Sequence, residues 1–258
     1  MRPPKALAAA VVRRILSPFI PVRKMLPFLF WLHTKSTDYD PYLAHLDQFC
    51  GSAGTAIDIG ANQGFYTYPL SKRFQRVHAF EINDEITDWI KLYNRGNIEL
   101  IHCGLSSTAG TASLHLPVTH GLALAGYGTL HRDILPEADE YVEKECRIAL
   151  LDDFGIMGVD FMKIDVEGHE MEVLKGATKT IEQSRPIVLI EVRTINERTV
   201  DAWFLALDYR QCRFDELDRL VVLAGFLPST GDCLYVPTER LDQLGLAATS
   251  PALEGIHH

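Results

Sequence analysis

The sequence predicts an α/β fold built on a mostly parallel sheet, and three observations support this prediction. An apolar run at residues 56–59 ends in a glycine turn, and helical patterning begins at Gly64. A second strand-like run ends at Glu81, and a third covers residues 99–103. Strands that alternate with helices through short connections form parallel sheets with right-handed crossovers.

The turn after the first strand, Gly60-Ala61-Asn62-Gln63-Gly64, is the central motif. A glycine turn that opens a helix is expected to present free backbone N–H groups where cofactors bind in open α/β sheets. Its spacing differs from the G-x-G-x-x-G pattern of nicotinamide-binding proteins. Glu81, 23 residues after Asp58, is placed to accept two hydrogen bonds from a ribose diol. The alternative is a tight turn with a solvated glutamate.

Composition narrows the class of protein. The 258 residues suit one α/β domain with an appendage, and a hydrophobic content of 47% supports a sizeable core. A net charge of −9 argues against general nucleic-acid binding, which requires a basic surface. The five cysteines are scattered and form no C-x-x-C pair, which indicates neither a disulfide framework nor a zinc site. A reduced, cytoplasmic setting is therefore expected.

Residues 1–37 differ from the rest of the chain. They hold seven basic residues and no acidic one, and their apolar runs are too short to span a bilayer. Arg13-Arg14 stands where a signal peptide would have its cleavage site. Two interpretations remain: a helix packed on the edge of the domain, or peripheral contact of residues 1–36 with an anionic inner-membrane surface. The membrane interpretation buries four aromatic residues, Phe19, Phe28, Phe30 and Trp31.

The chain then predicts its elements in order. Asp40-Pro41 starts a helix that ends near residue 49, and Asn83 or Asp84 caps a later helix to residue 93. Residues 104–150 form a long insertion, whose glycine-rich stretch at 121–128 reads as a lid or binding loop, or as a surface excursion. The candidates in this insertion for contact with an acceptor molecule, meaning the substrate, are Tyr127, Thr129, His131 and Arg132.

A second motif spans residues 160–170. A strand to Asp165 places Lys163 and Asp165 on one side, so Lys163 is expected to pair with Asp165 or Glu191. A helix follows from Gly168, and Gly176 within it indicates a close approach to another element. The next strand, residues 187–192, carries Glu191 at the same end of the sheet as Asp165.

These motifs, in this order and spacing, resemble the FkbM family of class I S-adenosylmethionine-dependent methyltransferases over about residues 50–237. The resemblance implies a Rossmann-like fold: a mostly parallel seven-stranded sheet, helices on both faces and an antiparallel final strand. It implies S-adenosylmethionine as cofactor and O-methylation of hydroxyl groups. The expected organisation is a basic N-terminal segment (1–37), a methyltransferase domain (38–240) and a C-terminal tail (241–258).

The cofactor is expected across the C-terminal ends of the first three strands. The backbone around Gly60 to Asn62 would face its methionine part, Glu81 its ribose, and Ile82 its adenine. Asp58 would anchor the loop or the methionine ammonium. The full set of cofactor residues is Asp58, Gly60, Asn62, Gly64, Glu81, Ile82, Leu105 and Ser106.

The acceptor side is expected at Asp165, Glu167, His169 and Glu191. Converging carboxylates raise one another's pKa, so that one of them can serve as a base near neutral pH. Asp165 and Glu191 also suit Mg²⁺ or Mn²⁺, which would orient a vicinal diol. His169 is a candidate base or simply a solvated residue at a helix start.

Three functions compete. The first is an O-methyltransferase that acts on a glycan, glycolipid or related metabolite, at the membrane surface or in solution. The second is an N-methyltransferase, which needs less assistance from a base. The third is a non-catalytic cofactor-binding scaffold, although an intact Gly60, Gly64 and Glu81 argue against it.

Overall fold

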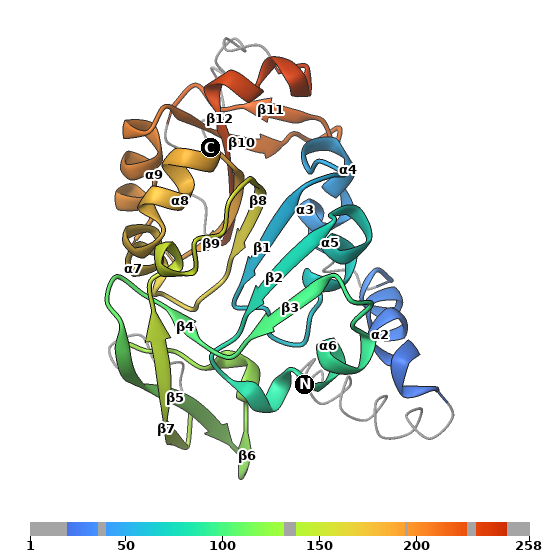
Figure 1. The fold of residues 1–258 in the computed structure, drawn as a ribbon, viewed down its shortest axis with the longest axis vertical. Helices are drawn as coiled ribbons and strands as arrows, with labels where there is room; N and C mark the ends of the chain where they lie inside the picture. Colours follow the sequence, from blue (N-terminus) through green and yellow to red (C-terminus); the bar gives the residue numbers. More distant parts are fainter. Residues whose placement is uncertain (1–19, 36–39, 132–137, 194–195, 226–230, 247–258) are drawn as a thin grey trace.

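The computed structural model describes residues 20–35, 40–131, 138–193, 196–225 and 231–246. Their centre is an eight-stranded sheet in the order β11-β10-β12-β9-β8-β1-β2-β3 (Figure 1). The parallel strands are β1 (Thr55–Ile59), β2 (Arg76–Phe80), β3 (Ile98–Ile101), β8 (Val159–Ile164) and β9 (Ile187–Val192). β12 (Gly231–Pro237) runs antiparallel between β9 and β10 (Tyr209–Phe214).

The α/β prediction with an antiparallel final strand is confirmed, but the sheet has one strand more than the seven expected. The eighth is β11 (Leu220–Val222), which pairs antiparallel with the outer edge of β10. The turn between them is held by Asp215, whose carboxylate accepts hydrogen bonds from the backbone N–H groups of Leu217 and Arg219, both at 2.9 Å. This local turn chemistry produces a short edge strand that the hydrophobic pattern did not reveal.

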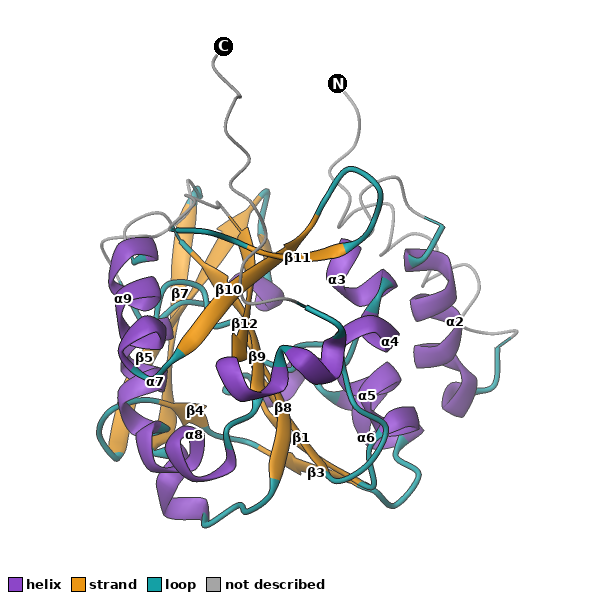
Figure 2. Ribbon diagram, turned by 90° about the horizontal axis from the view of Figure 1, so that it is seen from above, coloured by secondary structure: helices purple, strands orange, loops and turns teal. Residues whose placement is uncertain are grey.

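Helices cover both faces of the sheet (Figure 2). One layer holds α7 (Glu170–Gly176), α8 (Thr178–Ser184) and α9 (Glu197–Ala206). The other holds α3 (Pro41–Ala44), α4 (Leu46–Phe49), α5 (Thr67–Arg73) and α6 (Asp88–Tyr93). Strand alternation divides the core between them: Ala56 packs with the α3–α6 layer, whereas Ile57 packs with the α7–α9 layer. A sheet with two apolar faces is therefore buried on both sides.

The insertion forms a second, four-stranded sheet in the order β4-β7-β5-β6. Its strands are β4 (Gly104–Leu105), β5 (Gly110–Thr119), β6 (Leu122–Ala123) and β7 (Glu140–Ala149). Because β4 follows closely after β3, this small sheet is attached at the C-terminal end of β3 (Figure 1). The short helix η3 (Ala125–Tyr127) follows β6. Arg132 lies outside the described residues.

The N-terminal segment packs on the domain where it is described. Helix α2 (Met25–His33) buries Met25, Leu26 and Leu29 and lies against α5 and α6. Phe30, expected in the membrane interpretation to face lipid, instead packs against Tyr68 with the rings tilted and their centroids 5.0 Å apart. Trp31 stays 54% exposed. Phe19 lies outside the described residues.

Two predicted boundaries need correction. The single helix expected from Asp40 to residue 49 is two short helices, because His45 at their junction leaves helical geometry. The expected tail begins at 241, yet Leu241 and Leu246 are buried in the core. The folded body therefore extends to at least residue 246. Among the described residues, none of the helices has the length and apolar character required to cross a bilayer.

The packing of Gly60 explains why β1 ends in a glycine. Its φ is +79°, and a Cβ added there would lie 1.8 Å from the backbone oxygen of Asp165. At Gly60, the first glycine of the motif, the C-terminal ends of β1 and β8 therefore lie close together. The second, Gly64, packs against Ile90 and Leu26.

We expect Gly60→Ala to lower the free energy of unfolding by on the order of 3 kcal/mol, because it adds a backbone clash to an unfavourable φ. Gly96→Ala is the matched control, since Gly96 has a φ of +92° and open space around it. It should cost only about 1 kcal/mol. Urea denaturation of both variants measures the difference, and equal losses would contradict the clash.

Candidate active site

The backbone of the turn after β1 is already hydrogen-bonded within the protein. The N–H groups of Gly60 and Ala61 both donate to the carbonyl oxygen of Phe80 at 2.9 Å, and that of Asn62 donates to Glu81 at 2.7 Å. The expectation of free N–H groups at Gly60 to Asn62 is therefore wrong. The turn instead fixes the end of β2, where Glu81 begins the next loop.

Glu81 is a buried carboxylate with two backbone donors. Its side chain is 6% exposed; Oε2 accepts from Asn62 N at 2.7 Å and Oε1 accepts from Asn83 N at 2.8 Å. Burial raises the pKa of Glu81 to about 7, although the two backbone hydrogen bonds act to lower it. Each carboxylate oxygen keeps a lone pair for a further donor.

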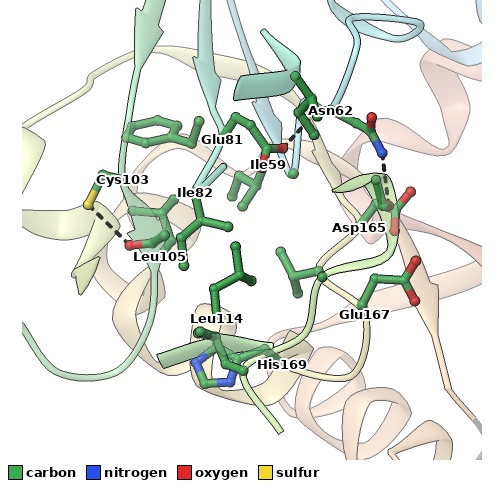
Figure 3. A pocket seen from close by; sticks show the side chains of 18 of the residues that line it. Ile59, Asn62, Glu81, Ile82, Cys103, Leu105, Leu114, Asp165, Glu167 and His169 are labelled. Carbon is green, nitrogen blue, oxygen red and sulfur yellow. Dashed lines mark hydrogen bonds between the residues drawn. The ribbon is translucent and has the colours of Figure 1, made fainter. Parts of the chain in front are cut away.

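A pocket opens beside this carboxylate (Figure 3). Its empty volume is about 670 Å³ when the open mouth is included. One part of the wall is apolar, whereas another carries carboxylates and an imidazole. The apolar part includes Ile82, Leu105, Leu114, Val166 and Leu130, and the polar part Asn62, Glu81, Asp165, Glu167 and His169.

The loop that follows β8 carries Asp165, Glu167 and His169 of this part and is here called the polar wall. Asp165 N donates to the carbonyl oxygen of Ile59 at 2.9 Å, which ties this loop to the glycine turn. Glu167 forms an ion pair with Arg193 and has a φ of +52°. Burial raises the pKa of Glu167, and the hydrogen bond from Arg193 opposes the rise. Asp165 and Glu167 thus both line the pocket.

His169 is held at both ring nitrogens. Nε2 lies 2.9 Å from Ser106 Oγ, and Nδ1 lies 2.9 Å from His131 Nε2. Burial, followed by the neighbouring His131, lowers the pKa of His169 to about 4. The imidazole is therefore neutral at physiological pH and has no free nitrogen in this arrangement. It is better placed to orient the loop than to accept a proton from an acceptor molecule.

Glu191 is half-buried and belongs to a cluster of charged groups with Asp165, Lys163 and Asp232. Lys163, 2% exposed, forms an ion pair with Asp232 rather than with either predicted partner. Burial and then the charge of Asp165 raise the pKa of Glu191 to about 8, whereas Lys163 lowers it. Glu191 is absent from the pocket wall but interacts electrostatically with Asp165, which is on it.

Three predicted cofactor residues, Asp58, Gly64 and Ser106, lie off the pocket wall. Asp58 is buried and accepts a 2.5 Å hydrogen bond from Thr67 Oγ1; burial raises its pKa to about 6. Ser106 contacts His169, and its backbone oxygen explains the glycine in α7, because a Cβ at Gly176 would lie 2.0 Å from it. Gly64 serves the packing of α2 and α6.

Sequence reasoning left several residues in or beside the pocket unassigned. Asn83 was recognised only as a helix cap, which is confirmed by its contact with Glu85 N. Its second contact, with Glu81, could not be read from the sequence. The insertion supplies Leu114, Ala125, Gly126, Gly128 and Leu130 to the wall. The glycine-rich stretch was the signal for these, and its interpretation as a binding loop agrees with this placement.

Within the residues that the structure covers, no group of three or more His, Cys, Asp or Glu side chains is arranged to hold an ion. The pair Asp165 and Glu191 gains no third ligand from its described neighbours.

Comparison with known proteins identifies the family. The methyltransferase FkbM domain matches residues 58–217. The methyltransferase sdnD of Sordaria araneosa is 30% identical over 156 residues, which cover 46% of this chain and 59% of that protein. The hexuronic acid methyltransferase AglP of Haloferax volcanii is 31% identical over 143 residues, covering 52% of this chain and 54% of that protein. The chain thus spans somewhat more than half the length of these curated relatives.

Among solved structures, a methyltransferase FkbM from Methylobacillus flagellatus superposes with a TM-score of 0.46 at 19% identity, covering 72% of this chain and 44% of that one. A precorrin-6y C5,15-methyltransferase from Geobacter metallireducens gives 0.43 at 13% identity, covering 78% and 87%. The domain match covers more than half of the sequence. This chain therefore belongs to the FkbM methyltransferase family.

Proposed function

We propose that this chain is an S-adenosylmethionine-dependent O-methyltransferase whose cofactor binds in the pocket beside Glu81. The observation that carries the proposal is the buried Glu81 carboxylate, fixed by two backbone N–H groups at the edge of a cavity. When bound, the cofactor would supply an electrophilic methyl group.

The residues present fit an adenosine. Glu81 keeps lone pairs for two ribose hydroxyls, and Ile82, Leu105 and Leu114 form an apolar wall suited to a flat base. Asn62 lies between Glu81 and the polar wall, where the methionine part would extend. Asp58, Gly64 and Ser106 would support this site from behind rather than touch the ligand.

Carboxylates at the polar wall favour a hydroxyl acceptor. Transfer to a hydroxyl needs a group that accepts its proton, whereas an amine needs less help. Asp165 lies on the wall, and its charge is one reason for the raised pKa of Glu191. We infer that Asp165 takes up the proton of the acceptor's hydroxyl group. The protonation of Glu191 then changes, because Asp165 has lost its negative charge. Glu167 is already ion-paired with Arg193, which makes Glu167 a weaker candidate for the base.

The acceptor class is proposed to be a glycan or glycolipid hydroxyl. This rests on the relative whose name describes a hexuronic acid methyltransferase, together with the carboxylate-rich wall. N-methylation is the alternative. A divalent cation on Asp165 and Glu191 stays a prediction that no third described ligand supports.

We also propose that the N-terminal segment contacts an anionic membrane. On the described part, Val22 and Trp31 are exposed apolar side chains, and Arg23 and Lys24 are exposed cations on the same segment. Apolar insertion combined with basic residues near headgroups is the usual basis of interfacial binding. Such contact would bring a lipid-linked acceptor to the enzyme.

We expect S-adenosylhomocysteine to bind about tenfold more tightly at pH 8 than at pH 6. Glu81 is mostly protonated at pH 6 and mostly ionised at pH 8 if its pKa is about 7, and only the ionised carboxylate accepts hydrogen bonds at both oxygens. Calorimetric titration at the two pH values measures this difference.

Glu81→Gln should bind weakly with no such pH dependence, whereas the exposed Glu182→Gln on α8 should behave as the wild type. A pH-independent affinity in the wild type would remove Glu81 from the site. Absence of binding to all of these proteins would reject the proposed cofactor.

We expect Lys24→Glu combined with Trp31→Ser to abolish sedimentation with anionic liposomes, because the pair reverses one charge and removes one insertion group at the α2 surface. Lys179→Glu combined with Leu205→Ser makes the same change on the opposite helix layer, where both residues are exposed, and should leave sedimentation intact. Equal behaviour of the two variants would reject the membrane contact.

A further inference from the structure

A segment of the insertion, residues 124–131, forms part of the pocket wall and is here called the strap. Its residues Ala125, Gly126, Gly128 and Leu130 line the pocket. The strap forms hydrogen bonds both with the polar wall and with the loops beside Glu81. On the polar side, Thr129 Oγ1 donates to the carbonyl oxygen of Glu167 at 2.9 Å, and His131 contacts His169.

On the ribose side the strap is bonded to two asparagines. Asn62 Nδ2 donates to the carbonyl oxygen of Gly126, and Asn83 Nδ2 donates to that of Ala125, both at 3.1 Å. The backbone N–H groups of the same two asparagines hold the two oxygens of Glu81. Each asparagine therefore joins the carboxylate to the strap.

The two asparagine side chains are closely packed against their hydrogen-bond partners. Asn83 is 1% exposed, and its Oδ1 also accepts from Glu85 N at 3.4 Å. Gly126 lies so close to Asn62 that an added Cβ would be 3.1 Å from its Nδ2. Buried amides that lose such partners are left unsatisfied, so the bonds on the two sides support each other.

We propose that Asn62 and Asn83 are positioning residues that make Glu81 and the strap one unit, so that the strap retains the cofactor. This inference rests on the proposed function. A ligand that donates hydrogen bonds to Glu81 also stabilises the two loops whose asparagine side chains are bonded to the strap. Loss of the two side-chain bonds should therefore speed dissociation of the ligand while leaving the Glu81 carboxylate in place.

The variants can remove these side-chain bonds alone. Asn62→Gly keeps the backbone N–H to Glu81 and suits the φ of +49° at this position. Asn83→Ser keeps its backbone N–H and a short hydroxyl for the helix cap, but does not reach Ala125. Asn97→Ser is the matched control, because Asn97 Nδ2 bonds the carbonyl oxygens of Ser71 and Phe74 away from the pocket.

Two measurements test the proposal on the full chain. Hydrogen exchange without ligand should become about tenfold faster within residues 124–131 in the Asn62→Gly, Asn83→Ser double variant, and should not change there in Asn97→Ser. Stopped-flow dissociation of S-adenosylhomocysteine should be about tenfold faster in the double variant, with a nearly unchanged association rate.

Unchanged exchange in the strap, or equal dissociation rates in wild type and double variant, would overturn the proposal. A wild-type protein that binds no S-adenosylhomocysteine would instead show that the proposed function itself fails. The two failures are therefore distinguishable.

Discussion

The burial of the Glu81 carboxylate is the interaction on which the rest of the site depends. A carboxylate that leaves water needs donors, and here the donors are the backbone N–H groups of Asn62 and Asn83. Asn83 follows Glu81 in the same loop, whereas the Asn62 donor is in place only if the glycine turn after β1 approaches the loop after β2. The shape of both turns, and hence the position of the pocket, follows from satisfying this one group.

The opposite wall depends on the same turn. Gly60 has no Cβ because the backbone of Asp165 occupies that space, so the loop after β8 is fixed at a set distance from Glu81. Behind Asp165, the buried Lys163 is bonded to Asp232 and offsets the carboxylates around it. That cluster keeps acidic groups close enough to change one another's pKa, which is useful for moving a proton at neutral pH.

Sequence alone predicted the elements whose signals are local. The strand–glycine-turn–helix motif, Glu81 at the end of β2, and the placement of Asp165 follow from strand length and alternation. It could not predict contacts between distant side chains. Lys163 and Asp232 are 69 positions apart, and Asn62 and Gly126 are 64 apart. The free N–H groups expected at Gly60 to Asn62 were wrong because their acceptors, Phe80 and Glu81, belong to another strand end. The two contacts of His169, with Ser106 and His131, were not predicted for the same reason, because both partners are distant in the sequence.

The most direct test of the account is to compare S-adenosylhomocysteine with its analogue lacking both ribose hydroxyls by calorimetric titration into the wild-type protein and Glu81→Ala. If Glu81 holds the diol, the analogue should bind the wild type about ten- to a hundredfold more weakly, as expected for loss of charged hydrogen bonds worth about 1.5–3 kcal/mol. Glu81→Ala should bind the two ligands alike. Equal affinities in the wild type would contradict the central claim, because the buried carboxylate would then have no ligand to hold.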